Sequence, residues 1–411
     1  MNKRLLKYIM GCAWLLTAAL GCLPGHALGR QYTYTEAAGD PSVSTDSVPY
    51  MLLTDMNVQM DVTNAVNNMY NFKFSEAEKE FQWFKYKYPT HPLPYFLLGL
   101  SQWWKMMPDV ERINYDNTFH AYMDSALYFA ERRYEMDEKN VEAKFFLAAA
   151  YAFKGRLYSE RKSWRKAASM SKKALDYLDI EDKTDNNFGP EFLFGDALYN
   201  YYVEWVPENY PLLRPILAFF PDGDKDLGLE QLKEVAGNAF YTRTEAQYFL
   251  MRILLLDEED PRRALQISEY LHQTFPDNPY FHRYHARLLY ANGNMYDARL
   301  VSESLLAKID SGMTGYEPVS GRYAAFFLGQ INERYKEYDK ARHYYERAVE
   351  FAEKIEATES GYYLYSLVQL AKIHEKQGNT RQAKKILRKV KKEAKRSHPA
   401  HEQARDYLKE W

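Results

Sequence analysis

The pattern of apolar and polar positions divides the chain into three parts. Residues 1–29 carry an apolar run behind a basic start, and residues 30–55 are rich in Ser, Thr, Gly and Pro without helical periodicity. From residue 56 onward the chain has the pattern of one helix after another. We therefore expect a signal peptide, a flexible leader and an all-α body.

Small residues recur in the body at a regular spacing. Ala264 and Ala298 lie 34 residues apart, and the next two intervals between such residues are 43 and 42, which indicates one period with loop insertions. Paired helices approach closely only where small side chains meet, so these positions predict where helical hairpins cross. The predicted anchors are Ala77, Ala264, Ala298, Ala341 and Ala383 in second helices, Gly329 in a first helix, and Gly293 and Gly378 at the turns.

These repeats resemble the tetratricopeptide repeat family. A period of 34 residues is typical of that family, and Pro276 follows Ala264 by twelve residues, where a hairpin of this type ends. The resemblance covers most of residues 56–397 and implies an α-solenoid of about eight hairpins that binds a protein or peptide in its concave groove. Asn332 and His374 replace consensus aromatic positions, so the groove chemistry of other members does not transfer residue by residue.

The centre of the body departs from the regular period. A predicted first helix, FGPEFLFGDALYNYYVEW, is separated from its predicted partner, DLGLEQLKEVAG, by a long insert. We therefore divide the body into N-terminal hairpins at 56–187, an irregular hairpin at 188–242, regular hairpins at 243–397 and a C-terminal cap at 398–411.

The insert at residues 206–221 is apolar although it contains four prolines. Pro207, Pro211, Pro215 and Pro221 are expected to forbid a regular helix there. The candidate partner-binding residues are Leu212, Leu213, Ile216, Leu217, Phe219 and Phe220. They fit either extra core or a docking element, since long loops in compact arrays are often functional. The order of apolar run, Gly-Asp turn and Gly-Leu-x-x-Leu helix locally resembles the Iml2/tetratricopeptide-repeat-39 group, a resemblance that implies no activity here.

The N-terminus predicts export by a bacterial type of signal. Three basic residues precede an apolar stretch from Tyr8 to Leu23, and no acidic residue occurs before Glu36. Two processing routes remain open, because residues 27–29 offer an ordinary cleavage site and Cys22 ends a weak lipoprotein box. We expect a periplasmic or outer-membrane-associated protein, with lipidation of Cys22 as the alternative to simple cleavage.

Charge is unevenly distributed along the chain. The formal net charge is −2, yet residues 372–411 hold 13 Lys and Arg against 5 Asp and Glu. The run AKKILRKVKKEAKRSHPAH could be the solvated face of a capping helix, or a contact for anionic lipid, an acidic protein or a polyanionic glycan. Nucleic acid is not an expected partner, because the rest of an exported body is acidic.

Candidate chemistry is sparse. Asp222, Asp224 and Asp226 have the spacing of a calcium loop, but the later positions do not fit, so an Asp-rich helix cap is the alternative. His282 and His285 lie one helical turn apart and could hold part of a metal site, although no third ligand is indicated. We predict no resident metal and no cofactor.

Catalytic motifs are absent from the sequence, which favours a binding protein over an enzyme. There is no nucleophile elbow, phosphate loop or zincin motif. With 36 Tyr and 22 Phe, the chain has aromatic side chains suited to a binding surface. Candidates for an exposed aromatic stripe are Trp103, Trp104, Tyr199, Tyr201 and Tyr202.

The sequence as a whole therefore predicts a non-enzymatic scaffold of the bacterial envelope that binds a peptide or protein segment. The alternative is an envelope lipoprotein that captures a glycan or nutrient, which the aromatic content and Cys22 would favour.

Overall fold

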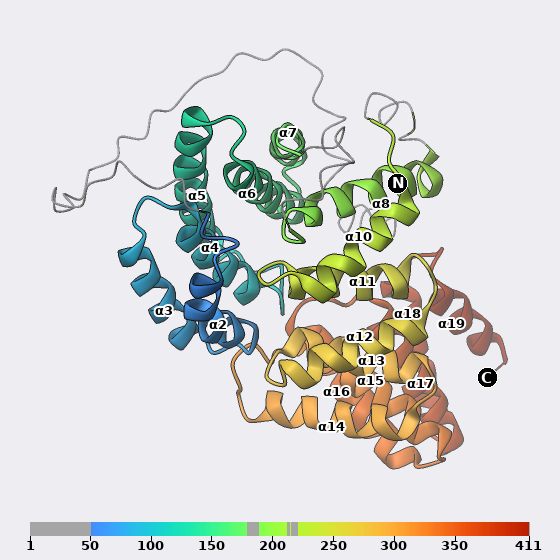
Figure 1. Cartoon of the computed structure of the whole chain (residues 1–411). Helices are drawn as coiled ribbons and strands as arrows, with labels where there is room; N and C mark the ends of the chain where they lie inside the picture. Colours follow the sequence, from blue (N-terminus) through green and yellow to red (C-terminus); the bar gives the residue numbers. More distant parts are fainter. Residues whose placement is uncertain (1–50, 179–188, 212–213, 215–220, 411) are drawn as a thin grey trace. The chain divides into compact units, whose positions relative to one another are not determined.

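The computed structural model describes residues 51–178, 189–211, 214 and 221–410, and this part of the chain is built from 17 helices without a β-strand (Figure 1). In chain order the helices form eight successive pairs followed by a terminal helix, α19. The predicted all-α class is thus confirmed. None of the described helices is both long and apolar enough to cross a membrane.

The helix bounds are as follows: α2 (Met56–Tyr70), α3 (Phe74–Lys87), α4 (Pro92–Met106), α5 (Asp116–Met136), α6 (Val141–Glu160), α7 (Trp164–Leu175), α8 (Leu193–Asn209), α10 (Lys225–Asn238), α11 (Arg243–Leu256), α12 (Pro261–Thr274), α13 (Pro279–Ala291), α14 (Met295–Asp310), α15 (Pro318–Arg334), α16 (Tyr338–Lys354), α17 (Gly361–Lys376), α18 (Thr380–Glu393) and α19 (Pro399–Glu410).

The chain folds into two compact units. Unit 1 consists of the described residues within Met1–Ala65, Lys79–Leu100 and Asp116–Arg243. Unit 2 consists of Val66–Glu78, Ser101–Tyr115 and Thr244–Trp411. Each unit has its own buried core, so each is described by itself.

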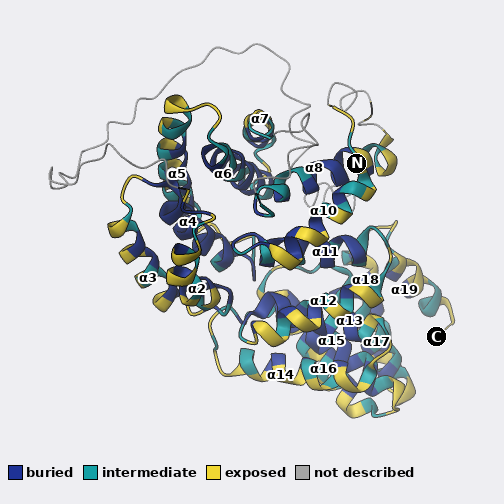
Figure 2. Cartoon of the chain, in the orientation of Figure 1, coloured by how far each residue is buried: buried dark blue, intermediate teal, exposed yellow. Residues whose placement is uncertain are grey.

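In unit 2, helical hairpins stack in sequence order. Each of α12 to α18 packs against the next helix, and the first helices α13, α15 and α17 also lie side by side. Because a first helix is enclosed by its partner and by both neighbouring hairpins, α13, α15 and α17 are buried over much of their surface, whereas α14, α16 and α18 bury one stripe (Figure 2). This is the stacking that a solenoid requires, since no hairpin can bury its apolar face alone.

Local sequence signals start and stop these helices. Asn278 accepts hydrogen bonds from the backbone N–H groups of Tyr280 and Phe281 at 3.0 and 3.1 Å, which caps α13. Pro279 occupies the first turn, where its missing N–H costs nothing. At the far end, Gly293 has a φ of +80°, a left-handed conformation that a glycine adopts without strain and that lets α14 turn back along α13.

In unit 1, the irregular hairpin forms as a close pair of helices. α8 packs against α10, and a Cβ on Gly228 would lie 2.6 Å from the backbone N of Tyr201 and 2.8 Å from the carbonyl O of Ala197. The two backbones can approach this closely only because Gly228 has no side chain. α5, α6 and α7 pack in succession in the same unit.

The expectation that Pro207 forbids a helix is wrong, because α8 continues through it to Asn209. Proline removes only its own N–H bond to the preceding turn, and just two helical residues follow it. A backbone hydrogen bond that follows the proline, from Tyr210 N to Val206 O at 2.8 Å, is kept. Two side chains satisfy carbonyls at this helix end, from Asn209 to Trp205 O and from Arg214 to Pro207 O.

Residues 51–55, at the end of the predicted leader, lie against the folded body. Leu52 and Leu53 are buried, and the backbone N–H of Leu53 donates to the carboxylate of Glu142 at 2.6 Å. The same carboxylate accepts His91 Nε2 at 3.0 Å, so a buried acid in α6 fixes the start of the described chain. Burial lowers the pKa of His91, with Glu142 opposing that shift.

The prediction of an exposed aromatic stripe at Trp103, Trp104, Tyr199, Tyr201 and Tyr202 is wrong, because all five side chains are buried. Trp104 donates its indole N–H to Glu245 at 2.7 Å and packs edge-on against Tyr70. Tyr199 donates its hydroxyl to the Pro221 carbonyl at 2.7 Å. Tryptophan and tyrosine can be buried when their polar tip finds a partner, and here the partners lie far away in sequence.

Candidate functional site

The repeat anchors lie at helix contacts in the described structure. Ala264, Ala298, Ala341 and Ala383 are fully buried in α12, α14, α16 and α18, and Ala77 is fully buried in α3. Each small side chain therefore allows another element to pack directly against its helix.

The anchoring glycines act at two kinds of position. A Cβ on Gly329 in α15 would lie 2.6 Å from the Tyr345 ring of α16, so the missing side chain makes room for that ring. Gly293 and Gly378 lie at the turns and have φ values of +80° and +77°. Both turn glycines adopt a backbone conformation that other residues rarely take.

A cluster of tyrosine and arginine side chains covers one side of the adjacent first helices in unit 2. We call it the tyrosine–arginine cluster, and it consists of Tyr280, Arg283, Tyr284, Arg287, Arg322, Tyr323 and Tyr362. The first four residues come from α13, the next two from α15 and the last from α17. None of the residues of this cluster is among the site residues predicted from the sequence.

The rings of the cluster contact one another within and between helices. Tyr280 and Tyr284 are stacked with centroids 4.9 Å apart, and the Tyr323 and Tyr362 rings are 4.5 Å apart. The guanidinium of Arg283 lies over both the Tyr280 and Tyr323 rings, at 4.8 and 5.4 Å. The three helices therefore contribute to one continuous aromatic and cationic surface.

The arginines of the cluster differ in how they are satisfied. Arg283 donates to the Pro108 carbonyl at 3.3 Å and to the Ser320 hydroxyl at 3.4 Å. Arg287 and Arg322 form no ion pair with a carboxylate among the described residues, and Arg322 Nε is buried without a hydrogen-bond partner there. Each of these two lies over a tyrosine ring instead, at 6.0 Å from Tyr284 and 5.2 Å from Tyr323.

The protonation states of the cluster favour recognition of an anion. Burial raises the pKa of Tyr362 to about 12, and burial also raises the pKa of Tyr280 well above its ordinary value. Both phenols are neutral at neutral pH, as ordinary tyrosines are, while the arginines keep their positive charge. The Tyr280 hydroxyl already contacts the hydroxyls of Tyr248 and Tyr284, at 3.4 and 3.3 Å. Donors and positive charge without an internal carboxylate are the chemistry that binds carboxylates.

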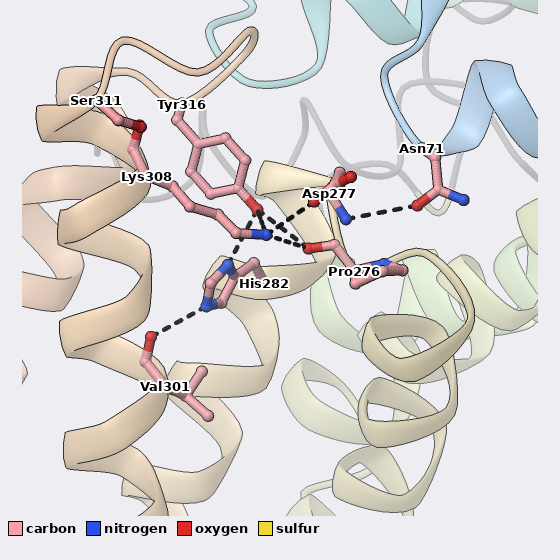
Figure 3. A network of polar contacts seen from close by, with 8 residues as sticks. All are labelled: Asn71, Pro276, Asp277, His282, Val301, Lys308, Ser311 and Tyr316. Carbon is pink, nitrogen blue, oxygen red and sulfur yellow. Dashed lines mark hydrogen bonds and ion pairs between the residues drawn. The ribbon is translucent and has the colours of Figure 1, made fainter.

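A second polar cluster lies on another side of α13, and its side chains form hydrogen bonds within the protein (Figure 3). His282 is buried, with Nδ1 3.0 Å from the Tyr316 hydroxyl and Nε2 3.0 Å from the Val301 carbonyl. Lys308 donates to the Pro276 carbonyl at 2.7 Å and to Asp277 at 3.0 Å. These contacts join α13, α14 and the loops that flank them.

The histidine pair noted in the sequence is a buried ring stack and shows no metal geometry. His272 of α12 lies against both His282 and His285, with ring centroids 4.5 and 5.2 Å apart. Burial lowers the pKa of His272 to about 4 and that of His282 to about 3, so both rings are neutral at pH 7. No group of three or more His, Cys, Asp or Glu side chains in the described part of the chain is arranged to hold a metal ion.

The aspartates noted as a weak calcium candidate lie at the start of α10. Asp224 is the N-cap and accepts a hydrogen bond from the backbone N–H of Leu227 at 2.9 Å. Asp222 precedes this cap and Asp226 lies in the first turn, where negative charge interacts favourably with the helix dipole. These contacts are those of an Asp-rich helix cap, the alternative to a calcium loop.

Other residues singled out in the sequence lie outside the described residues. They are Cys22, with the rest of the signal peptide, and the insert residues Leu212, Leu213, Ile216, Leu217, Phe219 and Phe220. Lipidation and docking at the insert therefore stay predictions.

Comparisons with known proteins bear on the repeats. Residues 322–392, which span α15 to α18, match the tetratricopeptide repeat family. No curated protein matches the chain, so the local resemblance to the Iml2 group stays a prediction. Among solved structures the chain is similar to a crystal structure of yeast Tom70, with 12% identity over 86% of this chain and 95% of that one. The TM-score of 0.23 is too low for this likeness to say anything about function. Residues 322–392 therefore match tetratricopeptide repeats, and the stacked hairpins of unit 2 have the arrangement that such repeats adopt.

Proposed function

We propose that the protein is an exported, non-enzymatic scaffold that binds an acidic segment of another protein on the tyrosine–arginine cluster. Tetratricopeptide repeats serve as protein-binding scaffolds, because stacked hairpins present an extended surface built from first-helix side chains. The cluster lies on three such helices, α13, α15 and α17.

The single observation that carries the proposal is the pair Arg287 and Arg322. Both are half-buried among tyrosine rings, and neither has a carboxylate partner among the described residues. A guanidinium in such surroundings has lost part of its hydration, which an incoming carboxylate can replace with two parallel hydrogen bonds. Tyrosine rings add contact area at low entropic cost.

The envelope location belongs to the same proposal and rests on the N-terminal sequence. The basic start, the apolar run and the small residues before position 30 are those of an export signal. We place the protein in the periplasm or at the outer membrane, with Cys22 as a lipid attachment site in the second case.

Site-specific photo-cross-linking in living cells tests the proposal. A benzoylphenylalanine in place of Tyr284 should capture one or a few proteins with acidic segments. The same probe in place of Tyr296, an exposed tyrosine on α14, is the matched control and should capture little. Equal capture at both positions would rule out the cluster as the binding surface.

Capture of a glycan would support the alternative function. In that case the Tyr284→Ala and Tyr323→Ala variants should lose binding to an immobilised oligosaccharide, while Arg287→Gln should retain it. Stacking on tyrosine does not need the arginine charge, so the two ligand classes separate by these variants.

A further inference from the structure

Helix α18 carries a row of exposed cations along its outer side. Arg381, Lys385, Arg388 and Lys392 follow at intervals of four, three and four residues, and all four are exposed. This spacing places them on one face of the helix over a length of roughly 16 Å, at about 1.5 Å of rise per residue. We call these four residues the basic stripe. Ala383, Leu387 and Val390 are buried on the opposite face.

The basic stripe is unpaired, whereas two other lysines of the same segment are paired. No residue of the stripe forms an ion pair or side-chain hydrogen bond with another described residue. Two lysines of the same segment, Lys389 and Lys395, contact Glu353 and Glu359 at 2.9 and 3.1 Å. The positive charges of Lys389 and Lys395 therefore have carboxylate partners in the described part of the chain, and those of the stripe do not.

Helix α19, which follows α18 at the end of the array, is solvated without a row of unpaired cations. In α19, Arg405 contacts Glu402 at 3.0 Å and Asp406 at 2.9 Å, and Lys409 contacts Asp406 at 3.5 Å. Mixed charges of this kind make a polar face without repulsion. Like charges four residues apart destabilise a helix, so the stripe on α18 carries a cost that solvation alone does not require.

We propose that the basic stripe of α18 binds the anionic headgroups of a phospholipid surface. The exposed positions of α18 are Arg381, Gln382, Lys385, Arg388, Lys391 and Lys392, and none is aromatic or apolar. The anchors of protein interfaces are typically Trp, Tyr and Arg side chains packed in desolvated pockets, whereas this face has no aromatic residue and both its arginines are exposed. A straight row of unpaired cations instead matches a flat, diffuse layer of negative charge, where each basic residue contributes roughly a fivefold gain in binding.

Vesicle flotation with the full-length chain tests this proposal. The chain should bind vesicles of phosphatidylglycerol and phosphatidylcholine but not vesicles of phosphatidylcholine alone. Replacing Arg381, Lys385, Arg388 and Lys392 together by Gln should weaken binding by more than about 100-fold. Raising the salt concentration should weaken binding of the unaltered chain in the same direction.

A matched variant distinguishes the effect of the basic stripe on vesicle binding from the effect of net charge alone. Lys340→Gln, Arg342→Gln, Arg405→Gln and Lys409→Gln together remove the same charge from cations that already have carboxylate partners. This variant should keep vesicle binding within about threefold, and circular dichroism should show native helix content for both variants.

Three outcomes would overturn the proposal. They are equal binding to neutral vesicles, equal loss in both variants, and no vesicle binding by the unaltered chain. In the last case, binding of soluble polyglutamate that only the stripe variant loses would assign the stripe to an acidic protein instead. The proposal is independent of the tyrosine–arginine cluster, since Arg287→Gln should leave vesicle binding unchanged.

Discussion

Helix α13 has two polar sides that differ in how their groups are satisfied. On one side, both ring nitrogens of His282 have partners within the protein, and the ring packs against His272 with centroids 4.5 Å apart. On the other side, Arg287 lies over a tyrosine and has no carboxylate partner among the described residues. The nitrogens of His282 are thus satisfied without a ligand, whereas the charge of Arg287 has no internal carboxylate in the described structure. Polar burial therefore marks a binding surface only where internal partners are missing.

The largest expected loss of stability comes from a change on the side of α13 that carries His282, which we call the histidine side. His282→Ala should lower the free energy of unfolding by about 3 kcal/mol, because it leaves a cavity and removes the partners of the Tyr316 hydroxyl and the Val301 carbonyl. Urea denaturation followed by circular dichroism measures this change. A loss below about 1 kcal/mol would mean that the histidine side is not the packed core described above.

Acidification should also destabilise the histidine side. The folded protein holds the pKa of His282 at about 3 and that of His272 at about 4, while an unfolded histidine titrates near about 6.5. Between these values the unfolded chain binds more protons, so stability is present above about pH 6.5 and falls as the pH drops. For His282 alone the fall is about 2 kcal/mol between pH 7 and pH 5.

Urea denaturation at several pH values measures this dependence. The double variant His272→Gln with His282→Gln should make it clearly shallower, whereas His343→Gln, at an exposed position of α16, should not. The same slope in both variants would place the proton uptake elsewhere in the protein.

Removal of a helix cap in unit 1 should cause a loss of stability of intermediate size. Asp224→Ala removes the cap of α10 and should cost about 1 kcal/mol of stability. Thermal unfolding measures the effect, with Asp222→Ala as the control for the loss of negative charge alone. Addition of millimolar Ca²⁺ should not raise the melting temperature. A rise that Asp224→Ala abolishes would instead support a calcium site.

The smallest expected effect on stability is on the tyrosine–arginine side. Arg287→Gln with Arg322→Gln should change the free energy of unfolding by less than about 1 kcal/mol, because the lost contacts with tyrosine rings are partly offset by removal of two half-buried charges that have no carboxylate partner among the described residues. Differential scanning calorimetry beside His282→Ala makes the comparison direct. A loss as large as that of His282→Ala would show that the arginines are structural.

The period of small residues allowed the fold to be predicted from sequence. The Ala264-to-Ala298 interval reflects a geometric requirement that repeats in every hairpin, so it is visible without knowledge of distant contacts. The turn residue Gly293 is visible for the same reason, because its left-handed backbone is a local property.

The candidate site could not be predicted in the same way. Trp104 was expected on a surface, but its buried partner Glu245 lies 141 residues further along the chain. The cluster on α13 did leave a signal, because Tyr280, Tyr284 and Arg287 follow at the four- and three-residue spacing of one helix face. Their neighbours Tyr323 and Tyr362 come from other hairpins, and only the stacked fold brings them together.

The central claim is that the two unpaired arginines make the tyrosine–arginine side a surface for an acidic partner. The most direct test measures cross-linking from benzoylphenylalanine at position 284 with and without the Arg287→Gln and Arg322→Gln changes. The account predicts at least a tenfold loss of captured protein when both arginines are replaced, with stability unchanged. Undiminished capture in the double variant would contradict it.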